Sequence, residues 1–373
     1  MSVIQAAIPV FERLPLPDMV SRAAVSYLVG RTCDKLRAVP RDINKRFAAG
    51  MPNYPIAESV DDANAQHYEV PAAFFDLVLG PNRKYSCCYY DSPTSTLAQA
   101  EESALARTAE NALLADGQHI LELGCGWGSL SLWMASHYPD ARVTAVSNSQ
   151  SQRAFIASEA QRRGLKNLDV ITADMNGFDP QQRFDRVVSV EMFEHMANWR
   201  ALLTRVRSWL KPNGMLFFHV FTHKNAPYRF EKDDKEDWIA QHFFTGGIMP
   251  SQELIREFGD LFSVDAIWRW SGTHYRRTAD HWLENFDRNG DAIDAVLRQT
   301  YGADAALWRR RWRLFFLATA GLFGFADGAE WGVGHYRLPA GGLITRRPTT
   351  APHNTTPPPR RPTRRRPRRC RAA

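Results

Sequence analysis

The chain has few cysteines and no long hydrophobic run, and each absence excludes a class of protein. Its five cysteines match neither a disulfide framework nor the spacing of a zinc site. We therefore expect reduced thiols, a cytoplasmic protein and no bound metal. The longest apolar stretch, at 314–326, is shorter than the ~18 to 20 residues that span a membrane. The first residues lack a basic leader, which argues against a secretory signal.

Positive charge is concentrated at the C-terminal end. The chain has 47 Lys and Arg against 40 Asp and Glu, a formal net charge of +7. Residues 339–373 hold ten Arg, eight Pro and no acid, which leaves a net charge of −3 for residues 1–338. This composition cannot form a packed core, so we predict a disordered tail at 339–373. Because the tail has no aromatic residue and no base-reading fold, we expect no specific nucleic-acid partner.

Strand-like and helix-like segments alternate through the middle of the chain. Apolar runs of β type lie at 119–124, 142–147, 168–173, 184–190 and 215–221, separated by helical stretches such as 150–164 and 198–210. This alternation predicts an α/β fold with parallel strands and helices on both sheet faces. Two further runs, at 262–270 and 330–338, would close the sheet. Residues 1–65 read as a helical N-terminal segment, and Thr96 is placed to cap a helix that begins near Leu97.

The first strand runs into the glycine-rich turn "LELGCGWGSL". Glu122 is followed by Gly124, Gly126 and Gly128, and a helix begins near Ser129. Glycines let the backbone pass closely beneath a nucleotide-like ligand at the carboxyl end of the strand. The third glycine is one residue too early for the dinucleotide fingerprint, and no phosphate-loop G-K-[ST] follows. A plain strand-to-helix turn is the alternative. The string resembles the first motif of class I S-adenosylmethionine (SAM) methyltransferases.

That resemblance implies further cofactor contacts at the ends of later strands. Many such enzymes hold the ribose hydroxyls with an acid after the second strand, whereas this chain has the neutral Ser147, Asn148 and Gln152 there. After the third strand, Asp174 would accept a hydrogen bond from the adenine amino group and Met175 would pack on the ring. A helix cap is the alternative role for Asp174.

Two longer motifs make the resemblance more specific. The segments "QHYEVPAAFFDLVLGPNRKYSCCYY" and "VVSVEMFEHM" resemble the cyclopropane fatty acid synthase superfamily, which includes the coclaurine-type N-methyltransferases. The match covers roughly residues 60–338. It implies a Rossmann-like sheet of seven strands with the last one antiparallel, in a methyltransferase domain at 66–338 with a helical cap insert at about 222–320. In this family the pair that corresponds to Tyr85 and Ser86 touches the cofactor.

One chemistry of the superfamily is cyclopropanation of lipids. An alkene attacks the methyl group, and a bound bicarbonate then removes a proton from it. The residues that hold this ion in the family correspond to Cys87, Glu194, His219 and Tyr275. This set implies the alternative function of a cyclopropane-fatty-acyl-phospholipid synthase-like enzyme with a lipid acceptor and bicarbonate.

The other chemistry is amine methylation, in which the nitrogen must first lose a proton because an ammonium has no lone pair. Glu191, Glu194 and His195 stand together after the fourth strand. Carboxylates there would stabilise the charge that develops on nitrogen, and His195 would act as the base. The coclaurine-type enzymes share this E-x-x-E-H arrangement, whereas lipid cyclopropane synthases usually have Gly in place of Glu191. We therefore predict an N-methyltransferase of small-molecule amines. A SAM-fold binding module without catalysis is disfavoured by this intact set.

A basic, aromatic stretch at 307–323 has two interpretations. It could contact anionic lipid head groups as a peripheral membrane element, or form a solvated helix face. The residues concerned are Arg309, Arg310, Arg311, Arg313, Trp308 and Trp312.

Overall fold

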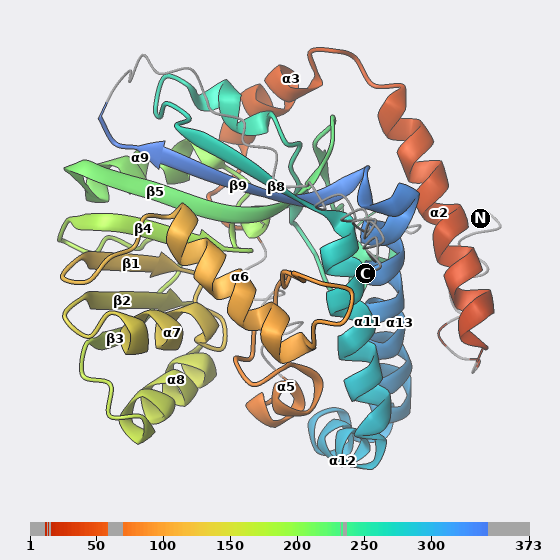
Figure 1. The fold of residues 1–373 in the computed structure, drawn as a ribbon. Helices are drawn as coiled ribbons and strands as arrows, with labels where there is room; N and C mark the ends of the chain where they lie inside the picture. Colours follow the sequence, from red (N-terminus) through yellow and green to blue (C-terminus); the bar gives the residue numbers. More distant parts are fainter. Residues whose placement is uncertain are drawn as a thin grey trace, which may run out of the picture.

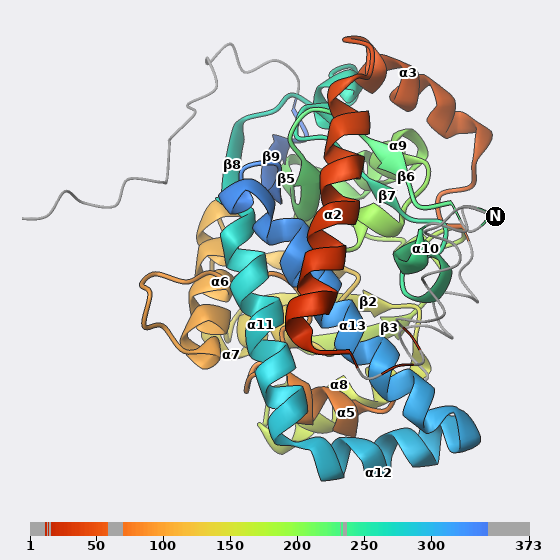
Figure 2. The ribbon, with the colours of Figure 1, turned by 90° about the vertical axis from the view of Figure 1, so that its right-hand side faces the viewer.

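The computed structural model describes residues 12, 14, 16–58, 70–231, 233 and 237–341. The tail predicted to be disordered lies outside the described residues from 342 onward, as does the start of the "QHYEV" motif. The predicted N-terminal helices are present as α2 (Asp18–Arg37) and α3 (Ile43–Gly50), followed by the 3₁₀ turn η1 (Met51–Asn53). Helix α2 lies along one side of the molecule, beside α13 (Ala305–Gly324) (Figure 2).

A seven-stranded sheet forms the centre of the molecule (Figure 1). Its order is β3-β2-β1-β4-β5-β9-β8, and β9 is antiparallel to both of its neighbours while the others are parallel. The strands are β1 (His119–Leu123), β2 (Arg142–Ser147), β3 (Leu168–Thr172), β4 (Phe184–Val190), β5 (Leu210–His223), β8 (Ala266–Ser271) and β9 (Trp331–Pro339). The predicted methyltransferase topology is confirmed. Strand β8 begins four residues later than the apolar run suggested.

The central strands are apolar along their length because helices cover both faces of the sheet. Ile120 and Val188 belong to a buried cluster with residues of α6 (Leu97–Asn111) and α7 (Ser129–His137). Their neighbours Leu121 and Val187 point to the other face and pack in the cluster that includes α9 (Trp199–Trp209). Helix α8 (Gln150–Arg162) connects β2 to β3. Thr96 caps α6 as predicted, in a reciprocal capping box with Gln99.

A cap of helices stands against the sheet on the side of the strands' carboxyl ends (Figure 1). It contains α10 (Trp238–His242), α11 (Gly272–Arg288), α12 (Gly290–Tyr301) and α13, with α5 (Ala72–Val78) packed against α11 and α12. A short ribbon, β6 (Tyr228–Arg229) with β7 (Ile248–Met249), flanks α10 in the sequence. The remaining turns are η2 (Phe193–His195), η3 (Leu254–Phe258), η4 (Gly302–Asp304) and η5 (Phe325–Gly328). The range 222–320, predicted as one insert, also contains the sheet strand β8, so the cap consists of two segments that flank this strand.

The arginines of α13 bind other parts of the chain. Arg309 pairs with Asp294 at 2.7 Å, Arg311 with Glu12 at 2.9 Å, and Arg313 with Asp287 at 2.9 Å. Arg310 donates to the backbone carbonyl of Glu12. These contacts hold α13 against α11, α12 and the residue Glu12. Across the described ranges, no helix combines the length and apolarity needed to cross a membrane.

Candidate active site

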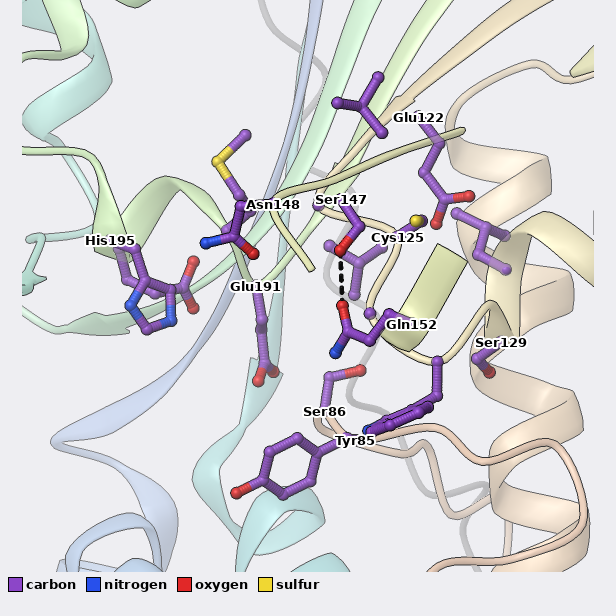
Figure 3. A pocket seen from close by; sticks show the side chains of 18 of the residues that line it. Tyr85, Ser86, Glu122, Cys125, Ser129, Ser147, Asn148, Gln152, Glu191 and His195 are labelled. Atoms are coloured by element: carbon purple, nitrogen blue, oxygen red, sulfur yellow. Dashed lines mark hydrogen bonds between the residues drawn. The ribbon is translucent and has the colours of Figure 1, made fainter. Parts of the chain in front are cut away.

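A cavity of about 220 Å³ lies at the carboxyl ends of β1, β2 and β4, beneath the cap. Open α/β sheets bind their ligands at this edge. Its walls come from the glycine turn after β1, the ends of β2 to β4, the segment 83–86 and aromatic residues of the cap. Figure 3 shows how side chains from these distant parts of the sequence point toward a common space.

The glycine turn has the geometry that close approach of a ligand requires. Gly124, Gly126 and Gly128 all have positive φ, at +78°, +51° and +80°. A Cβ on Gly124 would lie 2.6 Å from the Met192 side chain, and one on Gly128 would lie 2.7 Å from Ile156. A Cβ on Gly126 would meet no heavy atom within 4 Å, so this backbone borders open space. Two of the glycines are therefore required by packing, and Gly126 is the one that a ligand can approach.

The predicted ribose-binding side chains line the cavity next to this turn. The Ser147 hydroxyl donates to Oε1 of Gln152 at 2.7 Å, which orients the amide (Figure 3). Asn148 projects beside it (Figure 3). Neutral amides offer both a donor and an acceptor, so they can bind ribose hydroxyls without a charge. The residues present therefore fit a nucleoside at this position.

Glu122 and the predicted adenine contacts also border the cavity. Glu122 is buried and accepts a hydrogen bond from the Ser131 hydroxyl, and burial raises its pKa to about 7. Met175 is buried against the cavity, as a residue that packs on a flat ring would be. Asp174 is exposed, and its carboxylate accepts a hydrogen bond from the backbone N–H of Asn176 at 2.9 Å. Asp174 thus stabilises a local turn at the cavity rim. This role is similar to the helix cap that was considered as the alternative.

The segment that carries Tyr85 and Ser86 is anchored by two buried charged residues that sequence reasoning missed. The Lys84 ammonium donates to the Ser86 hydroxyl at 2.5 Å and to the Cys87 carbonyl at 2.7 Å. Glu101, on α6, accepts backbone N–H bonds from Gly80, Asn82 and Lys84 at 3.0, 2.8 and 3.2 Å. Burial raises the pKa of Glu101 to about 7. The position of Lys84 directly before the Tyr85–Ser86 pair was the available signal for the first of them.

Glu191 is the centre of the polar cluster. Its carboxylate accepts hydrogen bonds from the Cys87 backbone N–H at 2.9 Å, from His219 Nε2 at 3.0 Å and from the Tyr275 hydroxyl at 2.6 Å. It has a φ of +49°, in the left-handed region. Burial raises the pKa of Glu191, and the charge of Lys84 opposes that rise, as do the hydrogen bonds from Tyr275 and the Cys87 N–H. Three separate parts of the chain thus converge on one carboxylate.

The residues expected to hold bicarbonate are gathered here, but three of the four, all except Glu194, bind Glu191. His219, Tyr275 and the Cys87 backbone donate to its carboxylate. The thiol of Cys87 instead donates to the Cys88 carbonyl at 3.4 Å, and burial raises the pKa of this thiol well above its usual value. Cys87 therefore contributes its backbone amide and not its thiol. The side chain of Glu191 occupies the donors that a bicarbonate would need, so the residues present do not fit that ion.

Glu194 and His195 lie on η2 and border the same cavity. Glu194 is fully buried; no side chain among the described residues donates a hydrogen bond to its carboxyl, and the backbone N–H groups of Glu194 and Phe221 lie near it. Burial and the nearby charge of Glu191 raise the pKa of Glu194 well above its usual value. The His195 ring lies 4.3 Å from the Phe244 ring, between centroids. Figure 3 shows Glu191 and His195 directed into one space. The three side chains predicted for amine chemistry are thus brought together.

Aromatic side chains line the cavity beside this trio. They come from β5, the segment before β7, α11 and α13, namely Phe221, Phe244, Tyr275, Trp282 and Phe315. An apolar lining next to acidic groups suits a molecule with one basic atom on a hydrophobic body.

The sequence comparisons agree with this geometry. Residues 57–325 match the family model described as mycolic acid cyclopropane synthetase. The chain is 38% identical over 285 residues to (S)-coclaurine N-methyltransferase of Thalictrum flavum subsp. glaucum, covering 75% of this chain and 79% of the relative. It is 30% identical over 284 residues to cyclopropane-fatty-acyl-phospholipid synthase of Escherichia coli (strain K12), covering 76% of this chain and 69% of the relative.

The fold comparison favours the same branch. A crystal structure of coclaurine N-methyltransferase bound to N-methylheliamine and SAH superposes with a TM-score of 0.86 at 32% identity, covering 90% of this chain and 99% of that one. The predicted family, fold and SAM cofactor are confirmed. The chain belongs to the mycolic acid cyclopropane synthetase family and is a SAM-dependent methyltransferase.

Proposed function

We propose that this enzyme methylates the nitrogen of a small, largely apolar amine, and that Glu191, Glu194 and His195 carry the reaction. The observation that supports this most strongly is the Glu191 carboxylate, held by three donors at the positions expected to hold bicarbonate. A site filled in this way lacks room for the ion that cyclopropanation needs. It keeps a fixed negative charge beside the cavity instead.

SAM, when bound, supplies a methyl group on a sulfonium, and the residues that would hold it are those of the cavity's sheet side. Gly126 would allow close approach of the backbone, Asn148 and Gln152 would face the ribose, and Met175 would pack on the ring. Ser86 lies at the opposite wall, oriented by Lys84. The adjoining Glu191, Glu194 and His195, together with the aromatic lining, would bind the acceptor.

The acidic groups prepare the amine. An incoming ammonium gives Glu194, to which no side chain donates, a further hydrogen-bond donor, which relieves part of the cost of burying that carboxyl. His195 takes one proton from the nitrogen, whose freed lone pair then forms the new N–C bond as the C–S bond breaks. The electron pair of that bond stays on sulfur, and the nitrogen takes on the positive charge. The carboxylate of Glu191 stabilises that charge, because it is already oriented and needs no rearrangement.

Heliamine is a suitable probe amine, since a relative has been crystallised with N-methylheliamine. We expect the wild-type protein to convert heliamine and SAM to N-methylheliamine, measured by mass spectrometry. Glu191→Gln should lower the rate roughly 10²-fold, as for loss of a preorganised electrostatic group. Asp169→Asn removes the same charge from an exposed position on β3 and serves as the control. A Glu191→Gln enzyme as fast as the Asp169→Asn enzyme would contradict the assigned role.

A further inference from the structure

Lys84 is a buried cation without a carboxylate partner. Its side chain is 2% exposed. Its ammonium donates only to neutral oxygens, the Ser86 hydroxyl and the Cys87 carbonyl, and no ion pair to it occurs among the described residues. Burying an unpaired charge is costly, so a lysine kept in this position calls for a reason beyond packing.

A single residue connects this cation to the acidic centre of the site. The Cys87 carbonyl accepts from Lys84 at 2.7 Å, and the Cys87 N–H donates to Glu191 at 2.9 Å. Lys84 and Glu191 therefore both bind the backbone of Cys87. The backbone N–H of Lys84 is itself held by Glu101 on α6.

The other groups around Glu191 are neutral. Burial raises the pKa of Cys87 and of Tyr275 well above their usual values, so both stay protonated. Burial lowers the pKa of His219 well below its usual value, and the charge of Lys84 acts in the same direction. Two titratable neighbours remain: Glu194 adds no positive charge, and His195 is uncharged when it acts as the proposed base. Lys84 thus supplies the one positive charge that this set of described residues places behind Glu191.

We propose that Lys84 is a positioning residue that keeps Glu191 ionised in the buried site while it fixes the Ser86 segment against the cofactor. This inference rests on the proposed function, in which the charge of Glu191 stabilises the methylated nitrogen. Lys84 acts through Glu191 and Ser86 and touches neither reacting atom. It explains how a fully buried carboxylate can stay charged: among the influences on the pKa of Glu191, the charge of Lys84 is the largest that lowers it.

The ionisation of Glu191 can be measured directly. We suggest labelling the glutamate side-chain carboxyls with ¹³C and following their resonances with pH, the Glu191 signal being identified by its loss in Glu191→Gln. An opposite charge nearby typically shifts a carboxyl pKa by about one to three units. Lys84→Met keeps roughly the length of the side chain and removes its charge. In this variant the pKa of Glu191 should be about one unit or more higher. Lys166→Met removes an exposed lysine and should leave it unchanged.

Kinetics with heliamine provide the second readout. Glu191 acts as the anion, so activity falls as pH drops through its pKa, and a higher pKa in Lys84→Met moves this acid limb to higher pH. A merely structural loss would lower the rate equally at every pH. Lys84→Gln gives a second uncharged variant should Lys84→Met misfold. An unshifted Glu191 titration in both variants would overturn the inference. Because that titration needs no acceptor, a wild-type enzyme inactive on heliamine would count against the proposed function alone.

Discussion

The Tyr275 hydroxyl donates to the Glu191 carboxylate at 2.6 Å, and this bond joins the cap to the sheet. Glu191 follows β4, whereas Tyr275 lies on α11, with its ring stacked on Phe323 of α13 at 4.3 Å between centroids. The charged acceptor of the site is therefore positioned by a residue of the cap. The position of the cap and the orientation of the carboxylate are thus linked by one hydrogen bond.

Removing that hydroxyl should slow the enzyme without weakening cofactor binding. A hydrogen bond to a charged group contributes about 1.5 to 3 kcal/mol, so Tyr275→Phe should reduce turnover of heliamine roughly 10- to 100-fold. The aromatic stacking on Phe323 remains, which preserves the cap. Steady-state kinetics together with calorimetry of SAH binding would separate the two effects. Loss of SAH affinity with unchanged turnover would contradict this assignment.

A side chain at Gly126 should abolish SAM binding. A Cβ there would project into the open space where the protein backbone is expected to contact the cofactor. Gly164 is a matched control, because it also has positive φ, +70°, and open space around it, but does not line the cavity. We expect calorimetry to show no SAM binding by Gly126→Val and normal binding by Gly164→Val. Equal affinity of the two folded variants would place the cofactor elsewhere.

Loss of the proposed base should change the pH dependence of the reaction. General-base catalysis contributes typically 10²- to 10⁴-fold, so His195→Ala should be slower by about that range. The deficit should grow as pH falls, because more of the amine is then protonated and needs its proton removed. Rates measured from pH 6 to pH 10 would show this trend. A pH profile of unchanged shape would indicate that another group removes the proton.

The ionisation of Glu122 should cost stability at high pH. Its folded pKa of about 7 lies above the ordinary 4.5, so the folded state holds its proton more tightly, and this contribution to stability is lost as pH rises from 4.5 through 7. Such a shift corresponds to a few kcal/mol, on the order of 3. Glu122→Gln keeps an acceptor for Ser131 without the charge. Denaturant unfolding should therefore give Glu122→Gln a free energy of unfolding that, relative to wild type, is higher at pH 8 than at pH 5. A difference that does not change with pH would refute this.

Much of the fold followed from local patterns. Continuous apolar runs identified all seven strands, because strands covered on both faces contain few polar residues. Strand β4 was bounded correctly at both ends, at 184–190. The run at 262–270 indicated the edge strand β8, but its start was placed four residues early and it was included within a single cap insert. The antiparallel direction of β9 came from the family resemblance, because strand direction leaves no trace in the run itself.

The site was predicted less completely. Residues consecutive in a motif, such as Glu191, Glu194 and His195, could be assigned to one place because they share a strand end. Glu101 could not, since its three backbone partners lie 17 to 21 residues earlier and meet it only after folding. Nor could the sequence show that the Glu191 carboxylate would take the donors expected for bicarbonate. This arrangement depends on the folded positions of the side chain that follows β4 and of the donors on β5 and α11.

The choice between amine and lipid chemistry can be tested in one reaction. The wild-type protein is incubated with methyl-labelled SAM, heliamine and vesicles of unsaturated phospholipid, in rigorously decarbonated buffer. Glu191 already fills the site of the ion, so the account predicts label in N-methylheliamine, none in the acyl chains, and no change when bicarbonate is added back. Label that enters the acyl chains, appears only with bicarbonate and spares the amine would contradict it.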